Sequence, residues 1–593
     1  MRRLLLLSAA AVLLVHPAAA APALPDVSPA LAAVIADYDA VERRFDPDAA
    51  AQDGDREALG RLADDSPTAL AALRQALEVL DARLKALPPP DPASEDAVDR
   101  GALAFALNSQ LAGLRLDTAR INFDAYSGFH LTPQQLGRQT HIRDRADADA
   151  YLKRLAALPR YYETEIANAR RGAQTGFTQP APTVAVVLAI ARKQAAIPAA
   201  EDGLTAPLAD LPPSIPAADQ ATLRAEGLKR VEAFKASEAA FVAFLETEYA
   251  PQARPSLAAR DLPGGEAFYR AEIARHTTTD LTPDQIHQIG LGEVKRIRAA
   301  MEAEIRASGF KGDFKAFQHF LRTDPQFYVT TRQALLEKSA LFAKTVDDTL
   351  PHVFGRLPRL PFAVREIPRE SEESATTAYY EPGSPALGVA GGYEVNTSHL
   401  DQRPLYEIPA LSLHESQPGH HLQIALQQER TDLPAFRRHA ELTAFVEGWA
   451  LYSEQLGEEL GLYRTPYERF GHLSYDMWRA CRLVADTGIH WLRWSREQAR
   501  ACFTDNTALS PVNIEVELKR YVSWPGQALA YKVGELKLIE LRHRAEQKLG
   551  DRFDARAFHA AVLLHGSLPL SVLETRIDAW IAGQAQQPAK KKG

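Results

Sequence analysis

The chain has 593 residues, with 68 basic and 76 acidic side chains, a net charge of −8 and only two cysteines. This length excludes a small disulfide-stapled module and allows a large apolar core with more than one lobe. The acidic balance argues against a general role in binding nucleic acids or anionic membranes.

The N-terminus has the pattern of a secretory signal peptide, predicted to span residues 1–20. Arg2 and Arg3 precede an apolar run from Leu4 to Val15, and small residues follow up to a cleavage site after Ala20. The run is too short to cross a bilayer comfortably. The cysteine that lipoproteins carry at the cleavage site is missing here, so we do not expect a lipoprotein. We therefore expect a soluble protein, periplasmic or secreted, without stable membrane insertion and with a mature net charge of −10 once the two arginines are lost.

Residues 21–350 form a predicted helical N-terminal region. Apolar side chains recur every three or four residues, and Thr282 before Pro283 has the pattern of a helix start. Proline-rich breaks at 87–92 and 211–216 predict surface connections. One clear apolar stripe consists of Leu70, Leu73, Leu77, Leu80 and Leu84.

Residues 351–585 form a predicted catalytic region that begins with a small sheet. Three strands are expected at 360–367, 378–381 and 392–396, and helices resume from about residue 406. Residues 586–593 form a short basic tail, expected to be a solvated end. The fold class is therefore mainly α, with a small sheet.

The two cysteines, Cys481 and Cys502, are expected on neighbouring helical segments. Export would permit a disulfide, but the sequence leaves open whether they are bonded. Two such cysteines do not make a cysteine-type metal site.

The segment from His414 to His421 carries the strongest chemical signal, together with Glu447 on a later helix. Two histidines and one glutamate are a ligand set for a catalytic zinc ion that keeps one position open for water. Glu415, beside the first histidine, is then the expected general base. The plainer alternatives are a histidine-rich helix end and, for Glu447, a buried salt bridge.

The spacing differs from the familiar HExxH motif, because Pro418 stands where the second histidine would be. On a straight helix His420 would point about 120° away from His414, and His421 would lie roughly 10 Å along the axis. A break at Pro418-Gly419 would let the chain swing back. We therefore favour His420 as the second ligand, with His421 structural or supporting the ligands, and leave His421 open as the alternative.

Several spaced motifs together resemble the bacterial family called domain of unknown function 885, which is similar to the gluzincin zinc metallopeptidases. The resemblance covers most of the mature chain. Its motifs are His414-Glu415-x-x-Pro418-Gly419-His420, Phe445-x-Glu447-Gly448-Trp449-Ala450-Leu451-Tyr452, Asp486-Thr487-Gly488-x-His490 and Trp524-Pro525-Gly526-Gln527-Ala528-Leu529-x-Tyr531.

The resemblance implies a gluzincin-like helical metallopeptidase fold, with the small sheet beside the active-site helix and one zinc per chain. It implies His414, His420 and Glu447 as zinc ligands and Glu415 as the base. Gluzincins often carry an aspartate four residues after the ligand glutamate, and here that position is Leu451. Another carboxylate must then orient a ligand histidine, and the candidates are Glu454, Asp486 and Glu441.

His490 and Tyr531 are candidate donors to the oxyanion of the reaction. Asp486 could orient or charge His490 if the segment is helical. The alternative for Asp486 and His490 is an ordinary helix-stabilising pair. The alternative for Tyr531 is an ordinary core or interface tyrosine.

Three further residues are candidate substrate contacts. Asn396 lies on a strand that would pair with an extended peptide, as an edge strand does in gluzincins. A turn-capping role for Asn396 is an equally good hypothesis. Arg482 or Arg520 could bind a terminal carboxylate of the substrate, the alternative being a salt bridge.

The sequence thus predicts an exported zinc metallohydrolase that cleaves peptides or peptide-like substrates. Two rival hypotheses are a hydrolase of a non-peptide amide or ester, and a non-catalytic exported binding protein containing a metal. The carboxylate of Glu415 argues against the second, because a structural site does not need it. The substrate, the end from which it is attacked, the native metal and the oligomeric state stay open.

Overall fold

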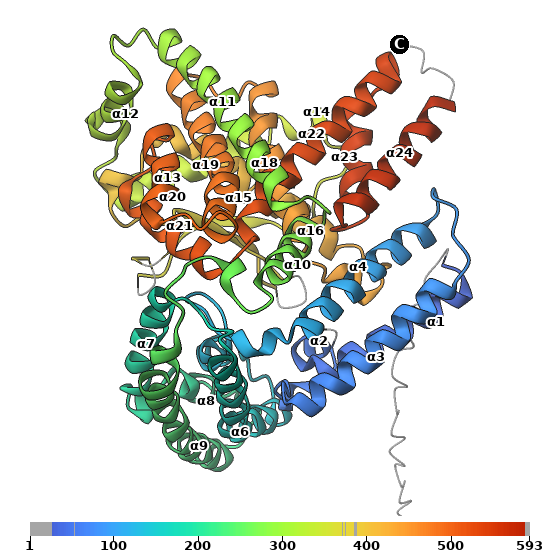
Figure 1. The fold of residues 1–593 in the computed structure, drawn as a ribbon, viewed down its shortest axis with the longest axis vertical. Helices are drawn as coiled ribbons and strands as arrows, with labels where there is room; N and C mark the ends of the chain where they lie inside the picture. The colour runs from blue at the N-terminus through green and yellow to red at the C-terminus, as the bar shows by residue number, and fades with distance from the viewer. Residues whose placement is uncertain (1–26, 53, 370–371, 374, 385–387, 587–593) are drawn as a thin grey trace, which may run out of the picture.

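The computed structural model describes residues 27–586 apart from 53, 370–371, 374 and 385–387. The predicted signal peptide and nearly all of the predicted basic tail lie outside these residues. Helices dominate the fold, as predicted, with one three-stranded sheet. Helices up to α9 form the lower part of the view in Figure 1, and those from α10 onward form the upper part.

The lower helices pack around two apolar clusters of their own. One cluster joins α1, α3 and α4, and the other joins α6, α7 and α9. The lower helices are α1 (Pro29–Phe45), α2 (Pro47–Gln52), α3 (Pro67–Ala86), α4 (Glu95–Leu116), α5 (Thr132–Gln139), α6 (Arg145–Thr175), α7 (Ala181–Ala195), α8 (Ala206–Ala209) and α9 (Ala217–Phe244).

The upper helices share one large apolar core, which includes side chains from α10 to α13 as well as from the later helices. The packing therefore does not divide at residue 350. These helices are α10 (Gly265–Thr277), α11 (Pro283–Ala307), α12 (Phe314–Thr323), α13 (Arg332–Val346), α14 (Leu350–Val353), α15 (Ile408–Glu415), α16 (His420–Gln428), α17 (Ala435–Arg438), α18 (Thr443–Glu459), α19 (Pro466–His490), α20 (Arg496–Asn506), α21 (Pro511–Ser523), α22 (Ala530–Leu549), α23 (Ala555–Leu563) and α24 (Leu570–Gln586). The predicted start of α11 is confirmed, because Thr282 caps it in a capping box.

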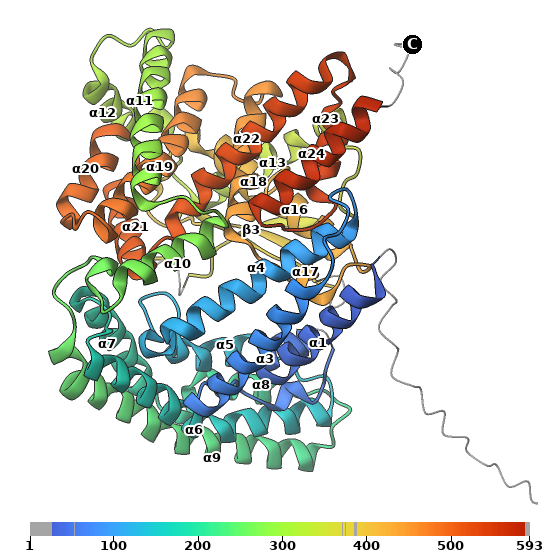
Figure 2. The same ribbon diagram turned by 45° about the vertical axis from the view of Figure 1, so that its right-hand side comes forward.

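The three predicted strands are present as β1 (Phe362–Glu366), β2 (Ala378–Glu381) and β3 (Gly391–Val395). Their order is β1-β3-β2, with β3 parallel to β1 and antiparallel to β2. The expectation that β3 offers a free edge to a peptide is therefore wrong, since both of its edges are paired. In Figure 2 the sheet is seen beside α16.

Two glycines let α18 and α22 cross in close contact. A Cβ on Gly448 would lie 2.5 Å from the carbonyl carbon of Gly534, and a Cβ on Gly534 would lie 1.9 Å from the Ala444 oxygen. Any larger residue would force the helices apart. Gly534 directly follows the first turn of α22, and Gly448 directly follows Glu447. The crossing therefore places the start of α22 near the turn of α18 that carries Glu447.

Two features bear on the compartment of the protein. Cys481 on α19 and Cys502 on α20 form a disulfide, with Cα atoms 5.7 Å apart, which answers the question that the sequence left open. Disulfides of this kind are typical of exported proteins. Within the described part of the chain, no helix combines the length and apolar character that a membrane span requires.

Candidate metal centre

The helix that carries His414 breaks at the predicted place. α15 ends at Glu415, and α16 begins at His420 after a short turn. At Gly419 a Cβ would lie 1.9 Å from the His414 oxygen and 2.4 Å from the Leu413 oxygen, so only glycine lets the chain fold back on the helix end. The Trp449 indole donates to the Pro418 oxygen at 2.8 Å and ties the turn to α18.

The fold-back brings His414 and His420 together with Glu447, and these three side chains could hold a metal ion. Glu447 Oε2 lies 3.4 Å from His414 Nε2 and 3.5 Å from His420 Nε2. The two imidazole rings are nearly perpendicular, with centroids 4.7 Å apart. Both Nε2 atoms thus lie near the same Glu447 oxygen, on rings of different orientation.

The spacing of the three donors fits zinc. Tetrahedral zinc with bonds of about 2.0–2.2 Å places two ligand atoms roughly 3.3–3.6 Å apart, as both Glu447 distances do. Glu447 Oε2 is also buried and has no hydrogen-bond partner among the described residues. A buried bare carboxylate oxygen is costly, and a cation would satisfy it. The same donors also suit cobalt or manganese.

The two carboxylates near the histidines are in opposite electrostatic situations. Burial raises the pKa of Glu415, and the neighbouring histidines only partly oppose this effect. Burial acts in the same direction on Glu447, but His420 and His414 hold its pKa well below its usual range. Glu447 is thus a charged partner of the histidines, whereas Glu415 is the carboxyl that takes up a proton more readily.

Glu454 supports His414 from the side opposite Glu447. Its Oε1 lies 2.8 Å from His414 Nδ1, and Arg479 donates to the same oxygen at 3.0 Å. A carboxylate on Nδ1 fixes the ring so that Nε2 points toward Glu447. Glu454 was one of the predicted candidates for this role, and it stands two turns after Glu447 on α18. Arg479 was missed, although a charged residue inside the buried helix α19 is a signal that could have found it.

His421 lies against the sheet and not with the metal ligands. Its Nδ1 is 2.9 Å from the Tyr380 hydroxyl on β2, and its ring packs on Phe362 of β1. Of the two alternatives from the sequence, the structure therefore groups His420 with the other ligands and gives His421 a structural place.

Asp486 and His490 are not brought to the metal ligands. The Tyr269 hydroxyl and the Gly526 amide both donate to Asp486. His490 uses both ring nitrogens on backbone groups: Nε2 lies 2.8 Å from the Tyr521 oxygen and Nδ1 accepts from the amide of Ala259. The expected catalytic His490 and supporting Asp486 are thus corrected to residues that hold α19 in the core.

Asn396 is likewise a structural residue in this geometry. It is fully buried, its amide nitrogen donates to the oxygens of Glu372 and Thr376, and its Oδ1 accepts from Ser398. These bonds tie the end of β3 to the preceding loop. Asn396 therefore has no free group for a substrate, which corrects the expected substrate contact.

Tyr531, Arg482 and Arg520 lie together. The Arg482 guanidinium is 4.1 Å from the Tyr531 ring centroid, and Arg520 Nη1 donates to the Tyr531 hydroxyl at 3.4 Å. Tyr531 is the second residue of α22, one turn before the glycine crossing, so it stands near the helix turn that carries Glu447. Sequence reasoning missed Glu517, the carboxylate shared by the two arginines.

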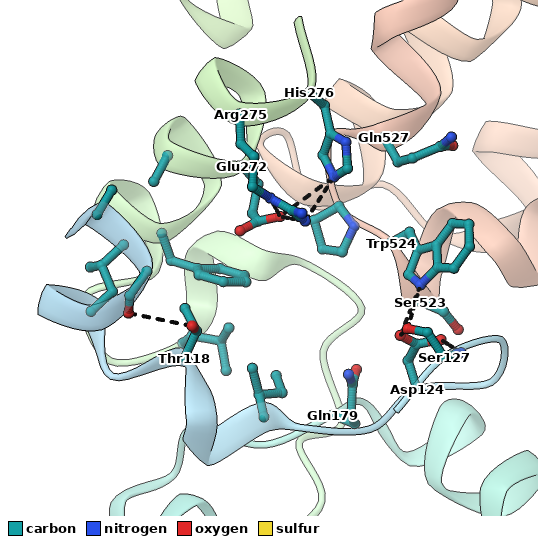
Figure 3. A pocket seen from close by; sticks show the side chains of 18 of the residues that line it. Thr118, Asp124, Ser127, Gln179, Glu272, Arg275, His276, Ser523, Trp524 and Gln527 are labelled. Carbon is teal, nitrogen blue, oxygen red and sulfur yellow. Dashed lines mark hydrogen bonds and ion pairs between the residues drawn. The ribbon is translucent and has the colours of Figure 1, made fainter. Parts of the chain in front are cut away.

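A cavity of about 580 Å³ lies between the lower and upper helices, and Figure 3 shows it from close by. Its walls come from α4, α10 and the loop before α22, where Trp524 donates to Asp124 at 2.8 Å. The three metal ligands are not in its wall. Thr443 is, and it stands one turn before Glu447 on α18, which links the cavity to the ligand helix. A second cavity of about 720 Å³ shares Thr443 with it.

Fold and site together define a mainly helical protein with a buried His-His-Glu group that could hold a metal ion. The chain belongs to the family of bacterial proteins of unknown function DUF885, whose model matches residues 47–577. This match confirms the family resemblance seen in the motifs.

Two solved structures share the fold. One, of a "putative lipoprotein" from Colwellia psychrerythraea, is 26% identical, with a TM-score of 0.85 over 93% of this chain and 99% of the other. The other, of a "putative lipoprotein of unknown function" from Shewanella oneidensis, is 19% identical, with a TM-score of 0.71 over 92% of this chain and 98% of the other. No curated protein matches the chain.

Proposed function

We propose that this protein is an exported, zinc-dependent metallohydrolase that cleaves peptide bonds. The observation that carries the proposal is the bare Glu447 oxygen facing two histidine nitrogens at 3.4 and 3.5 Å, with the buried Glu415 carboxyl interacting electrostatically with all three residues. Structural zinc sites are usually closed by four protein ligands. Three convergent donors and a further carboxyl outside the ligand set are typical of catalytic sites.

The residues of the chain have distinct roles in this proposal. A bound zinc ion would polarise the scissile carbonyl and make a water molecule more acidic. Glu415 accepts the proton from that water and passes it to the leaving amine. Glu454 keeps the His414 ring in place, and the Tyr531 hydroxyl donates to the oxyanion that develops on the substrate. His490, with both nitrogens engaged, takes no part.

Export rests on the disulfide and on the predicted signal peptide. The two related structures are described as lipoproteins, but both cysteines of this chain are joined in the disulfide, so neither is available for lipid attachment. We therefore propose a periplasmic or secreted enzyme.

The test is the variant Glu415→Gln of the mature protein, measured against a peptide library and for zinc content. We expect it to keep its zinc and to lose roughly 10²- to 10⁴-fold in turnover, the usual contribution of a general base. Glu302→Gln, an exposed glutamate of α11, is the matched control and should keep both. Full activity of Glu415→Gln would overturn the mechanism.

A further inference from the structure

A buried cluster of charge on α19 and α21 has two arginines for one carboxylate. Arg482 of α19 and Arg520 of α21 both donate to Glu517 Oε2, at 2.9 and 2.8 Å. Although burial opposes its charge, Arg520 and Arg482 lower the pKa of Glu517, so this residue is ionised. Glu517 is the one acid among the described ion-pair partners of the two guanidinium groups. One positive charge is left without a partner.

The Arg482 guanidinium is held flat and presents a free edge. It lies between the rings of Trp478 and Tyr531, 4.5 and 4.1 Å from their centroids. Its Nε donates to the Tyr521 hydroxyl and its Nη2 to Glu517. Its Nη1 has no hydrogen-bond partner among the described residues, although Arg482 is only 3% exposed. A buried donor without an acceptor is costly, so this free edge points to an anionic ligand with oxygen acceptors.

The cluster is connected to the metal ligands through α19. Arg482 follows Arg479 by one turn of α19, and Arg479 bonds the Glu454 carboxylate that holds His414. The ring of Trp478 packs on the guanidinium groups of Arg479 and Arg482, with centroid distances of 4.7 and 4.5 Å. Tyr531 is on α22, one turn before Gly534. Gly534 contacts Gly448, the residue after Glu447 on α18.

The chain segment that joins Arg520 to Tyr531 lines a cavity, although the side chains of the cluster itself are not in its wall. Arg520 and Tyr531 stand at the two ends of the segment 520–531. Between them, Ser523, Trp524 and Gln527 line the cavity of Figure 3. The side chain of Arg520 keeps 17% of its surface exposed, so the cluster is not sealed.

We propose that Arg482 and Arg520 bind the C-terminal carboxylate of the peptide substrate, which makes the protein a peptidase that acts from the C-terminal end. The inference rests on the proposed peptidase function and names its substrate class. The planar guanidinium fork matches a carboxylate with two parallel hydrogen bonds, and the carboxylate supplies the negative charge that the cluster lacks.

The first experiment compares one peptide with a free C-terminal acid, with a C-terminal amide, and with an acetylated N-terminus. The acid should be cleaved with kcat/KM roughly 10- to 100-fold above the amide, as expected for a charge-assisted bidentate contact, and acetylation should change little. Arg520→Gln should bring the acid-to-amide ratio toward one, mainly through KM. Arg500→Gln, whose arginine pairs with Glu515 outside the cluster, is the matched control and should keep the ratio.

A binding measurement separates this inference from the proposed function. Acetyl-dipeptides with acid and amide ends are titrated by calorimetry into Glu415→Gln, with and without Arg520→Gln. Tighter binding of the acid, lost with Arg520→Gln, supports the carboxylate site even if no peptide is ever cleaved. Cleavage and binding that do not distinguish acid from amide overturn it and leave the peptidase intact. A preference that follows an Asp or Glu side chain in amidated peptides overturns the C-terminal assignment.

Discussion

Replacing Gly419 by alanine should disable the metal centre without touching any ligand. The added Cβ would lie 1.9 Å from the His414 oxygen, whereas ordinary contacts begin at 3.4 Å, so the backbone must move by about 1.5 Å. Metal ligands tolerate displacements of only about 0.2 Å. Because His420 directly follows Gly419, we expect zinc affinity to fall by at least the roughly 10- to 100-fold seen when supporting contacts of a metal site are lost.

The assay is zinc affinity by competition with a chelator, together with thermal unfolding. Gly292→Ala is the matched control, because a Cβ there meets nothing within 4 Å in the interior of α11. This control should keep its zinc and gain about 0.5–1 kcal/mol of stability from the better helix former. Wild-type zinc affinity in Gly419→Ala would refute the argument that the glycine fold-back builds the site.

Two further variants probe a residue beside the metal ligands and a buried acid in the core of α19. Glu454→Gln should weaken zinc binding roughly 10- to 100-fold in the same competition assay, because a neutral amide supports His414 less well, and unchanged affinity would remove Glu454 from the site. Burial raises the pKa of Asp486 to about 7, so the folded protein holds a proton that the unfolded chain releases from about pH 4. Stability should therefore fall as pH rises from about 4 to 7, and Asp486→Asn should flatten this slope in urea unfolding; an unchanged slope would contradict it.

The sequence predicted the features that depend on local chemistry. The helix break at Pro418-Gly419 followed from the missing amide of proline and the freedom of glycine, and the strands followed from their composition. The choice of His420 over His421 rested on the same break. The structure contains the break and the three strands, and it groups His420, not His421, with His414 and Glu447.

Features that depend on distant parts of the chain could not be predicted in the same way. Nothing local to Asn396 shows that β3 is paired on both sides. His490 and Asp486 look like a catalytic pair in a helix, but their partners, Tyr521 and Tyr269, come from other elements. The pairing of Glu454 with His414 likewise required the packing of α18 against α15, so only a list of candidates could be drawn from the sequence.

The most direct test of the central claim is the zinc content of the purified mature protein beside the His420→Ala and His421→Ala variants. The account predicts about one zinc per chain in the wild type and in His421→Ala, and loss of that zinc in His420→Ala. No zinc in any form after zinc is supplied, or loss with His421→Ala in place of His420→Ala, would contradict it.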